Sequence, residues 1–418
     1  MRKLLCFFLS TLLVLLCAAG PVGAQKTKLI WTTCCGQPDR MELFTGLANQ
    51  YMAANPKVEI EMIHPTGSYY QTLLTWIAAG VGADVMWLGT TIWSFVDLLL
   101  PLDDLVAKDR NVASIHPSLL KTLRWDGKQI GLPYGVNTNL MAYNRDMFSA
   151  SGVAFPTSKW VLSDIATMGS RLVKDKDGDG TPDVWGISRI PDFNHALVQA
   201  GDFYSQDLKQ TAFVNSASIE ATQFLLDLNR GVYGVCAPTK TDPMFYGQQV
   251  AMHVIGTFFV PNGRLNCEFD WDVVEYPGLV QNDVRYDSAW VSFESWGINR
   301  ATKSPEIAKD FVGWLFQPEV MKQISGLGVV IPSQPQQARL FLNQPTPPSN
   351  LNAFVRSMDF VKRYNWDHPA GQHISSAYLS GSNPIYGEMV AGRTPVATAL
   401  PEIARQINSY LTEWWAKR

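Results

Sequence analysis

The most specific chemical pattern in this sequence is a short acidic loop that begins at Asp175. Carboxylates occupy its first, third, fifth and ninth positions, and Gly180 stands at the sixth. Carboxylates at this spacing can converge on a hard cation, and the glycine permits the sharp turn of an EF-hand-like calcium loop. The expected metal ligands are Asp175, Asp177, Asp179 and Asp183.

The loop departs from a complete EF-hand at its twelfth position. Gly186 stands there, where an EF-hand carries a bidentate Glu. A calcium ion would therefore need a further ligand or more water, and the alternative is an Asp/Gly-rich surface turn. We expect no required cofactor, with calcium in a structural role as the candidate ion.

Aromatic residues form the second set with a chemical role. The sequence contains 14 Trp, 14 Tyr and 20 Phe, and several of them fall between expected elements. An aromatic face covers the C–H surface of a sugar ring while polar neighbours satisfy its hydroxyls. For any single ring, core packing is the alternative. The set comprises Trp31, Tyr69, Tyr70, Trp87, Trp93, Phe193, Phe258, Phe259, Trp290, Phe293, Trp296 and Tyr378.

Catalytic sequence patterns are missing. We find no G-x-S-x-G elbow, no H-E-x-x-H, no Walker loop and no G-x-G-x-x-G after an expected strand, and the six His are scattered. A glycosidase needs only two carboxylates and no local motif. Glu294 and Asp192 are the candidates, so a secreted carbohydrate-active enzyme stays as an alternative.

Length and charge narrow the class of protein. The chain has 418 residues, 17% of them charged, and a formal net charge of -3. At roughly 150 residues per domain, this length allows two or three domains. Without clustered Lys and Arg, the chain lacks the electrostatic footprint of a nucleic-acid binder.

The N-terminal residues follow the three-part pattern of a secretory signal. Arg2 and Lys3 precede an apolar run over 4–19, and small residues lead to Ala24. We predict a signal peptide over 1–24 and an exported, periplasmic protein. The alternative is a retained membrane anchor, and no later stretch is long and apolar enough to cross a bilayer.

Four cysteines follow this signal, in a compartment where disulfides persist. They allow three pairings, and the simplest joins Cys236 to Cys267 and leaves Cys34 and Cys35 as an adjacent pair. The sequence does not decide among the pairings.

Strand and helix patterns alternate after the signal. Strands are expected at 28–33, 58–64 and 84–88, with amphipathic helices at 39–55 and 69–79 between them. This order predicts an α/β fold with a parallel sheet, whose ligands meet the carboxyl ends of the strands. Further helices are expected at 160–173, 216–228, 305–316, 318–325 and 401–416, and a crossing or surface segment at 334–349.

Four segments carry the patterns of one known family. They are GLPYGVNTNLMAYNRDMF over 131–148, AAGVGADV over 78–85, AMHVIGTF over 251–258, and WGIN followed by PEIAKDF within 296–311. In this order and spacing the chain resembles the extracellular solute-binding proteins of ABC sugar importers (family 1), the maltose-binding-protein class. The resemblance extends over nearly all of the sequence after the signal.

This resemblance implies a type II periplasmic binding protein. Such a fold has two α/β lobes, a hinge of crossing segments and a ligand cleft between the lobes. The N-terminal lobe would comprise 25–136 and 292–336, and the C-terminal lobe 137–291 and 337–418. A ligand that bridges both lobes would stabilise the closed form.

The implied function is binding without catalysis. The protein would be a monomeric component of an ABC importer that binds a mono-, di- or oligosaccharide or a polyol and delivers it to the permease subunits. A non-sugar solute, such as a phosphorylated polyol or a polyamine, is the second alternative. Arg264 or Arg393 facing the cleft would favour an anionic solute.

The resemblance also implies the residues that contact the ligand. Asn137 stands where this class carries a cleft carboxylate, Phe258 replaces a stacking Trp, and a disulfide between Cys34 and Cys35 would offer a flat sulfur surface. The implied ligand-binding residues are Cys35, Gln37, Tyr69, Tyr70, Thr91, Trp93, Asn137, Asp192, Phe193, Phe258, Phe293, Glu294, Ser295 and Tyr378.

Overall fold

The computed structural model describes residues 26–34, 38–65, 69–190 and 194–418. The predicted signal peptide lies outside these ranges. Within them, no helix combines the length and the hydropathy that crossing a membrane requires.

The first lobe is built on three parallel strands. β1 (Thr27–Thr32) pairs with β2 (Val58–Ile63) on one side and with β3 (Val85–Leu88) on the other. Helices α1 (Pro38–Ala54) and α2 (Tyr69–Ala78) connect these strands, as parallel pairing requires. The predicted strand and helix order is therefore confirmed here.

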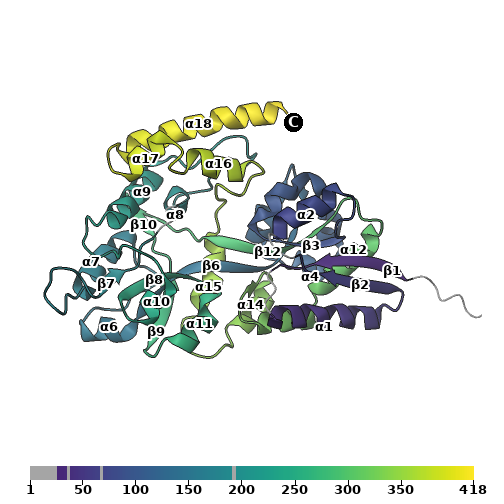
Figure 1. Cartoon of the computed structure of the whole chain (residues 1–418), viewed down its shortest axis with the longest axis horizontal. Helices are drawn as coiled ribbons and strands as arrows, with labels where there is room; N and C mark the ends of the chain where they lie inside the picture. Colours follow the sequence, from purple (N-terminus) through teal and green to yellow (C-terminus); the bar gives the residue numbers. More distant parts are fainter. Residues whose placement is uncertain (1–25, 35–37, 66–68, 191–193) are drawn as a thin grey trace, which may run out of the picture.

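A long strand, β6 (Leu132–Asn144), runs through both lobes (Figure 1). Its first half pairs antiparallel with β12 (Val291–Ile298) and with the short β13 (Ile331–Pro332). Its second half pairs antiparallel with β8 (Val250–Gly256) and β9 (Trp271–Glu275). The prediction of a parallel sheet is wrong for this part, because β6 and β12 make the sheet mixed.

The second lobe has the strand order β9, β6, β8, β7, with β7 at Trp185–Ile187. Helices α7 (Leu162–Leu172) and α9 (Ser216–Asn229) lie beside this sheet. The Asn215 side chain caps α9 by accepting a hydrogen bond from the Ser218 backbone N–H, which satisfies a donor at the helix start.

Both β6 and β12 pass through the predicted lobe boundaries near residues 136 and 292. Strand pairing alone therefore does not fix those boundaries, and the ranges given for the two lobes stay a prediction.

The remaining elements are η1 (Thr90–Leu98), α3 (Asp103–Lys108), α4 (Arg110–Ala113), α5 (Pro117–Thr122), β4 (Arg124–Trp125), β5 (Lys128–Gln129), α6 (Arg145–Ala150), α8 (Asn194–Leu197), α10 (Asp242–Tyr246), α11 (Phe259–Asn266), β10 (Leu279–Gln281), β11 (Val284–Tyr286), α12 (Pro305–Leu315), α13 (Pro318–Gly326), α14 (Pro335–Phe341), α15 (Asn352–Arg356), η2 (Ser357–Phe360), α16 (Gly371–Tyr378), α17 (Pro384–Val390) and α18 (Val396–Ala416).

The last helix, α18, begins earlier than the predicted Pro401. It starts at Val396 and takes Pro401 into its interior, although proline has no N–H to donate to the preceding turn. Val396, Leu400 and Ile403 are all buried, so a continuous apolar face outweighs the lost hydrogen bond. Figure 1 shows α18 (yellow) running along the top of the molecule from the second lobe.

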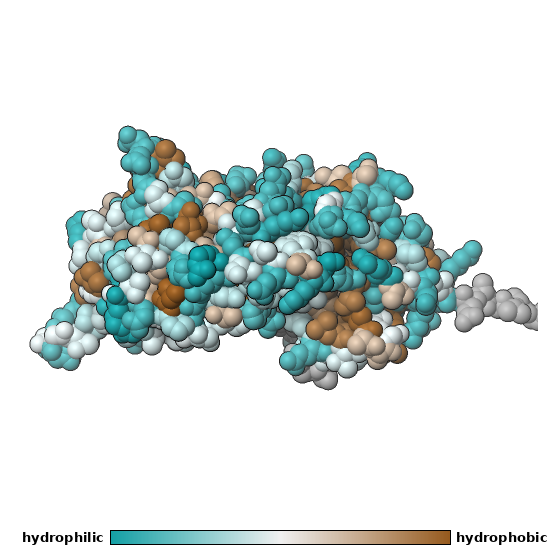
Figure 2. Space-filling model, turned by 90° about the horizontal axis from the view of Figure 1, so that it is seen from above, coloured by the Kyte–Doolittle hydropathy of each residue, from teal (hydrophilic) through white to brown (hydrophobic). Residues whose placement is uncertain are grey.

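The core of the first lobe is aromatic. Trp31 lies with its ring centroid 5.3 Å from Phe44, 5.3 Å from Trp296 and 5.0 Å from Phe311. Trp31 and Trp296 are fully buried, so core packing accounts for these two members of the aromatic set. On the face seen in Figure 2 the surface is mostly hydrophilic, with apolar residues in separate patches.

Candidate ligand-binding cleft

A buried carboxylate, Glu294, lies where β12 meets β6 beside a bulge. The Trp87 indole Nε1–H and the Tyr134 hydroxyl donate to Oε2 of Glu294 over 2.5 and 3.1 Å. The Asn137 amide donates to Oε1 over 3.4 Å, and Arg40 Nη1 lies 3.5 Å from Oε2. Four donors from three elements, α1, β3 and β6, thus converge on one carboxylate.

The charges around Glu294 reinforce each other. Burial, followed by the Glu294 charge, holds the pKa of Tyr134 well above its ordinary value, so this phenol stays a donor. Burial alone would lower the pKa of Arg40, but the Tyr134 and Glu294 oxygens outweigh it and raise that pKa. Arg40 and Glu294 therefore form an ion pair that is also hydrogen-bonded, as a buried pair requires.

An aromatic wall adjoins this network. The Tyr70 ring stacks on Trp87 at a centroid distance of 6.0 Å. Tyr69 is buried, and its hydroxyl donates to the Trp87 carbonyl over 2.9 Å, so it positions the wall. A Cβ at Gly89 would lie 3.1 Å from both Trp87 and Tyr70. Glycine there permits the close approach of the two rings.

A pocket of about 530 Å³ opens beside this wall, between the lobes. It is within the size range of small-molecule sites. The described lining residues include no Lys, Arg, Asp or Glu, and they combine rings with hydroxyl and amide groups. From the first lobe they are Tyr70, Gln71, Leu74, Thr90, Thr91, Trp93, Ser94 and Phe95, and from the opposite side Trp366, His368, Pro369, Gln372 and Ser375.

Trp93 lines this pocket but exposes almost none of its surface. It is 2% exposed, and its indole Nε1–H donates to Oδ1 of Asp367 over 3.2 Å. The other Asp367 oxygen accepts the Tyr364 backbone N–H over 2.7 Å. Burial raises the pKa of Asp367 to about 7. The Trp93–Asp367 hydrogen bond joins the first lobe to the segment that carries Trp366.

Trp366 is a lining residue that the sequence analysis did not identify. Its ring stacks on Tyr364 at 4.8 Å and meets Trp290 edge-on at 6.3 Å. Its indole N–H is buried and has no hydrogen-bond partner among the described residues. An unpaired buried donor is costly, and this one belongs to a side chain that lines the pocket.

The neighbour of Trp366, His368, is also buried and lines the pocket. Burial lowers the pKa of His368 to about 3, so the imidazole is neutral at physiological pH. The described residues of the lining therefore carry no charge at that pH.

The predicted ligand residues on β6 and β12 have different environments. Asn137 is 8% exposed, and its Oδ1 has no partner among the described residues. Phe293 is buried, and Ser295 is fully buried with its hydroxyl donating to the Leu88 carbonyl. Asn137 thus keeps a free acceptor beside Glu294, whereas the Ser295 hydroxyl is already used within the fold.

Of the predicted contacts that the structure describes, Tyr70, Thr91 and Trp93 line the pocket, and the others lie outside its lining: Tyr69, Asn137, Phe258, Phe293, Glu294, Ser295 and Tyr378. Phe258 is 55% exposed and directly precedes α11. Tyr378 packs against His373 and Tyr410 with centroids at 6.0 Å from each. The remaining predicted contacts, Cys35, Gln37, Asp192 and Phe193, lie outside the described residues.

The two arginines considered for an anionic solute do not line the pocket. Arg264 donates to the Pro347 carbonyl and to Gln344. Arg393 pairs with Glu388 on an exposed surface, at 2.7 Å. Neither residue therefore supplies the pocket with a positive charge.

The simplest of the three cysteine pairings, Cys236 with Cys267, does not form, since both are free. The Cys236 backbone pairs with Ile187 of β7 at one edge of the second-lobe sheet. Cys267 is the C-cap of α11, just before β9 at the other edge. Strands lie about 4.8 Å apart, so the sheet separates them by more than the roughly 7 Å limit for a disulfide. Cys35 lies outside the described residues, so its pairing with Cys34 stays a prediction.

The acidic loop lies exposed on the second lobe. Asp175, Asp177 and Asp183 each offer an oxygen within 4.8 Å of the others. The backbone N–H groups of Gly180 and Gly178 donate to Asp175 and lower the pKa of its carboxyl. Calcium binding by this loop, with Asp179 as a fourth ligand, stays a prediction.

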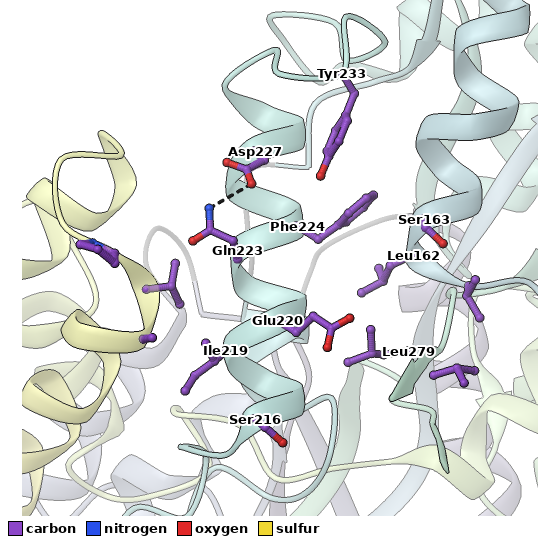
Figure 3. A pocket seen from close by; sticks show the side chains of 15 residues that line it. Leu162, Ser163, Ser216, Ile219, Glu220, Gln223, Phe224, Asp227, Tyr233 and Leu279 are labelled. Atoms are coloured by element: carbon purple, nitrogen blue, oxygen red, sulfur yellow. Dashed lines mark hydrogen bonds between the residues drawn. The ribbon is translucent and has the colours of Figure 1, made fainter. Parts of the chain in front are cut away.

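A larger pocket, about 770 Å³, lies within the second lobe. Figure 3 shows the Phe224 and Tyr233 rings beside α9, with Tyr233 above Phe224, and the Gln223 amide donating a hydrogen bond to Asp227 on the same helix. All of its lining residues come from 161–280 and 395–397. This groove therefore does not join the two lobes.

The fold and the cleft define a class of two-lobed binding proteins. Residues 46–340, more than half of the chain, match the family model "Bacterial extracellular solute-binding protein". The chain belongs to this family.

Individual relatives agree with this assignment. The maltotriose-binding protein of Pyrococcus abyssi is 24% identical over 93% of this chain and 78% of its own length. The cyclic alpha-maltosyl-1,6-maltose binding protein of Arthrobacter globiformis superposes with a TM-score of 0.75 at 18% identity, covering 93% of this chain and all of that one. The sugar-binding protein MalE of Xanthomonas citri gives 0.74 at 18% identity, covering 94% and 100%. The predicted two-lobed fold is confirmed.

Proposed function

We propose that this protein binds an uncharged sugar between its two lobes and delivers it intact to the permease of an ABC importer. The observation that carries the proposal is the pocket of about 530 Å³ whose described lining has aromatic, hydroxyl and amide groups but no acidic or basic side chain. Such a lining suits hydroxyl-rich neutral molecules and leaves a charged solute without a counter-charge.

Specific groups support a sugar. Tyr70 and Trp366 line the pocket, and the Trp366 N–H is a donor without a partner among the described residues. Asn137 Oδ1, beside Glu294, is an acceptor without a partner there, although Asn137 does not line the pocket. A sugar hydroxyl both donates and accepts, so it can satisfy either group. Glu294 holds the Trp87 indole in place behind Tyr70.

The relatives guide the choice of ligand. One is named for maltotriose and another for a cyclic maltosyl-maltose, so we propose α-linked glucose oligosaccharides as the first compounds to test. We further propose that the protein is exported by its N-terminal signal, works as a monomer in the periplasm and catalyses no reaction.

The test is a thermal-shift screen of purified protein, followed by calorimetry on any hit. Maltose, maltotriose, cyclic oligosaccharides, polyols, polyamines and sugar phosphates form the panel. We expect neutral saccharides to raise the melting temperature by binding in the interlobe pocket, with micromolar affinity, about −8 kcal/mol. Stabilisation by a polyamine or a sugar phosphate that competes with saccharide binding would contradict the proposal, and product release from a glycan would favour the enzyme alternative.

A further inference from the structure

A second location between the lobes contains a buried charge that makes no direct ion pair among the described residues. Arg363 is 7% exposed. Its Nη2 donates to the Lys121 carbonyl over 2.7 Å, but its Nη1 is buried without a hydrogen-bond partner. In the part of the chain that the structure describes, no carboxylate oxygen lies within the 4.0 Å limit for an ion pair with this guanidinium.

The nearest carboxylates are already engaged. Asp202 accepts the Arg363 backbone N–H over 2.9 Å, and its other oxygen lies 4.0 Å from Lys121 Nζ. Asp367 accepts from Trp93 and from the Tyr364 backbone. A buried charge is costly unless it is paired, and the Arg363 guanidinium keeps its positive charge under all ordinary conditions. Its environment therefore favours an added anion.

A pocket of about 480 Å³ adjoins Arg363, and other cations gather around it. Lys121, Arg124 and Lys209 line it together with Arg363. Of these, Arg124 is already paired with Asp103 at 3.0 Å. Lys121 lies at the 4.0 Å limit from Asp202, so Arg363 and Lys209 are the two lining cations without an ion pair among the described residues.

Two acidic residues, Asp126 and Asp207, also line the pocket. Oδ1 of Asp207 accepts from the Ser205 hydroxyl over 2.7 Å and from the Lys209 backbone N–H over 3.1 Å. The Asp207 carboxylate is therefore held by donors within the local 205–209 turn. Four basic and two acidic side chains line this pocket, whereas the described lining beside Trp366 has neither.

We propose that this pocket binds an oxyanion of the phosphate class, either inorganic phosphate or the phosphate group of a small molecule. The Arg363 guanidinium matches the geometry of phosphate oxygens, and Lys121 and Lys209 supply flexible charges beside it. Lys121 belongs to α5 of the first lobe, whereas Lys209 and Arg363 belong to the segments packed on the second. A bound anion would touch both lobes, and the site does not depend on the proposed sugar.

The experiment is a titration of the whole chain with sodium phosphate in phosphate-free buffer, with sodium chloride at matched ionic strength. We expect a saturable rise in melting temperature with phosphate alone. The double variant Lys121→Ala/Lys209→Ala should bind phosphate at least ten-fold more weakly in calorimetry. Lys322→Ala, which removes an exposed lysine of α13, is the matched control and should behave as the unmodified protein.

Two results would overturn the proposal. One is a phosphate response no larger than that of chloride, and the other is an equal phosphate affinity in the double variant and the control. A parallel titration with glycerol phosphate identifies the source of the group: tighter binding than inorganic phosphate assigns the site to a phosphorylated small molecule, and equal binding assigns it to free phosphate. Neither arm involves the saccharide panel.

Discussion

The pocket between the lobes and the groove on the second lobe differ in how their side chains are held. The groove is larger, about 770 against 530 Å³, and its Phe224 and Tyr233 rings stack on each other. In the interlobe pocket, Trp93 and Trp87 are each fixed by a carboxylate, Asp367 and Glu294 respectively. On volume alone, the groove would be the better candidate for the sugar-binding site. The cleft is the better candidate because its rings are held in place and it has an unpaired donor.

The largest expected effect separates these two regions directly. Trp366→Ala removes a ring and the unpaired N–H from the cleft, and we expect saccharide affinity to fall by about 2 kcal/mol, as for a central aromatic anchor. Phe224→Ala in the groove is the matched control and should leave affinity unchanged. Calorimetry with the best saccharide measures both. Equal losses in the two variants would remove the distinction between the regions.

The Trp93–Asp367 hydrogen bond gives the cleft a pH dependence that the groove lacks. The pKa of Asp367 is raised to about 7 by burial, against about 3.9 for an unfolded Asp. Between these values the folded state alone holds the proton, so the free energy of unfolding falls as pH rises toward 7 and is then constant.

Asp367→Asn removes this titration. Its stability relative to the unmodified protein should therefore increase by roughly 3 kcal/mol between pH 5 and pH 8, since about two pH units below the folded pKa count at about 1.4 kcal/mol each. Urea unfolding of both proteins at the two pH values measures the difference, which cancels contributions from His368 and other groups. A difference that is the same at both pH values would mean that Asp367 titrates normally.

Glu294→Gln tests whether the buried carboxylate supports the aromatic wall. The change leaves Arg40 without its ionic partner and weakens acceptance from Trp87. We expect about ten-fold weaker saccharide binding, about 1.4 kcal/mol, and a lower melting temperature. Glu388→Gln neutralises an exposed carboxylate paired with Arg393 and serves as the control. Unchanged affinity in Glu294→Gln would exclude a positioning role.

The smallest effect concerns the acidic loop. If Asp175 and Asp177 hold calcium, adding calcium after EDTA treatment should raise the melting temperature by about 2 °C. Asp175→Asn/Asp177→Asn should abolish this rise, and the exposed Glu413→Gln should retain it. No rise in the unmodified protein would end the calcium prediction.

Local sequence patterns predicted β1 to β3 of the first lobe well, because these strands pair with one another. Strands β1 to β3 alternate with helices, and parallel pairing follows from that order. The long β6 was not predicted as one strand, since a fully buried strand has no alternating pattern. Its antiparallel pairing with β12, some 150 residues away, depends on tertiary packing. Helix α14 was also missed within the Pro-rich segment, although Pro335 at its start is a recognised signal.

The site was only partly predictable for the same reason. Tyr70, Thr91 and Trp93 line the pocket because they follow strands or begin helices at the sheet edge. Ser295 was placed in the right strand, but its side chain bonds within the fold. Trp366 lies in a segment without regular structure, so neither periodicity nor the family resemblance identified it. Its aromatic and polar neighbours, Tyr364 to His368, were the signal that could have done so.

The central claim is that a neutral saccharide bridges the two lobes. Small-angle X-ray scattering with and without the saccharide that gives the largest thermal shift tests it most directly. The account predicts a smaller radius of gyration with saccharide for the unmodified protein, and none of this change for Trp366→Ala at the same concentration. An unchanged radius of gyration in the saturated, unmodified protein would contradict it.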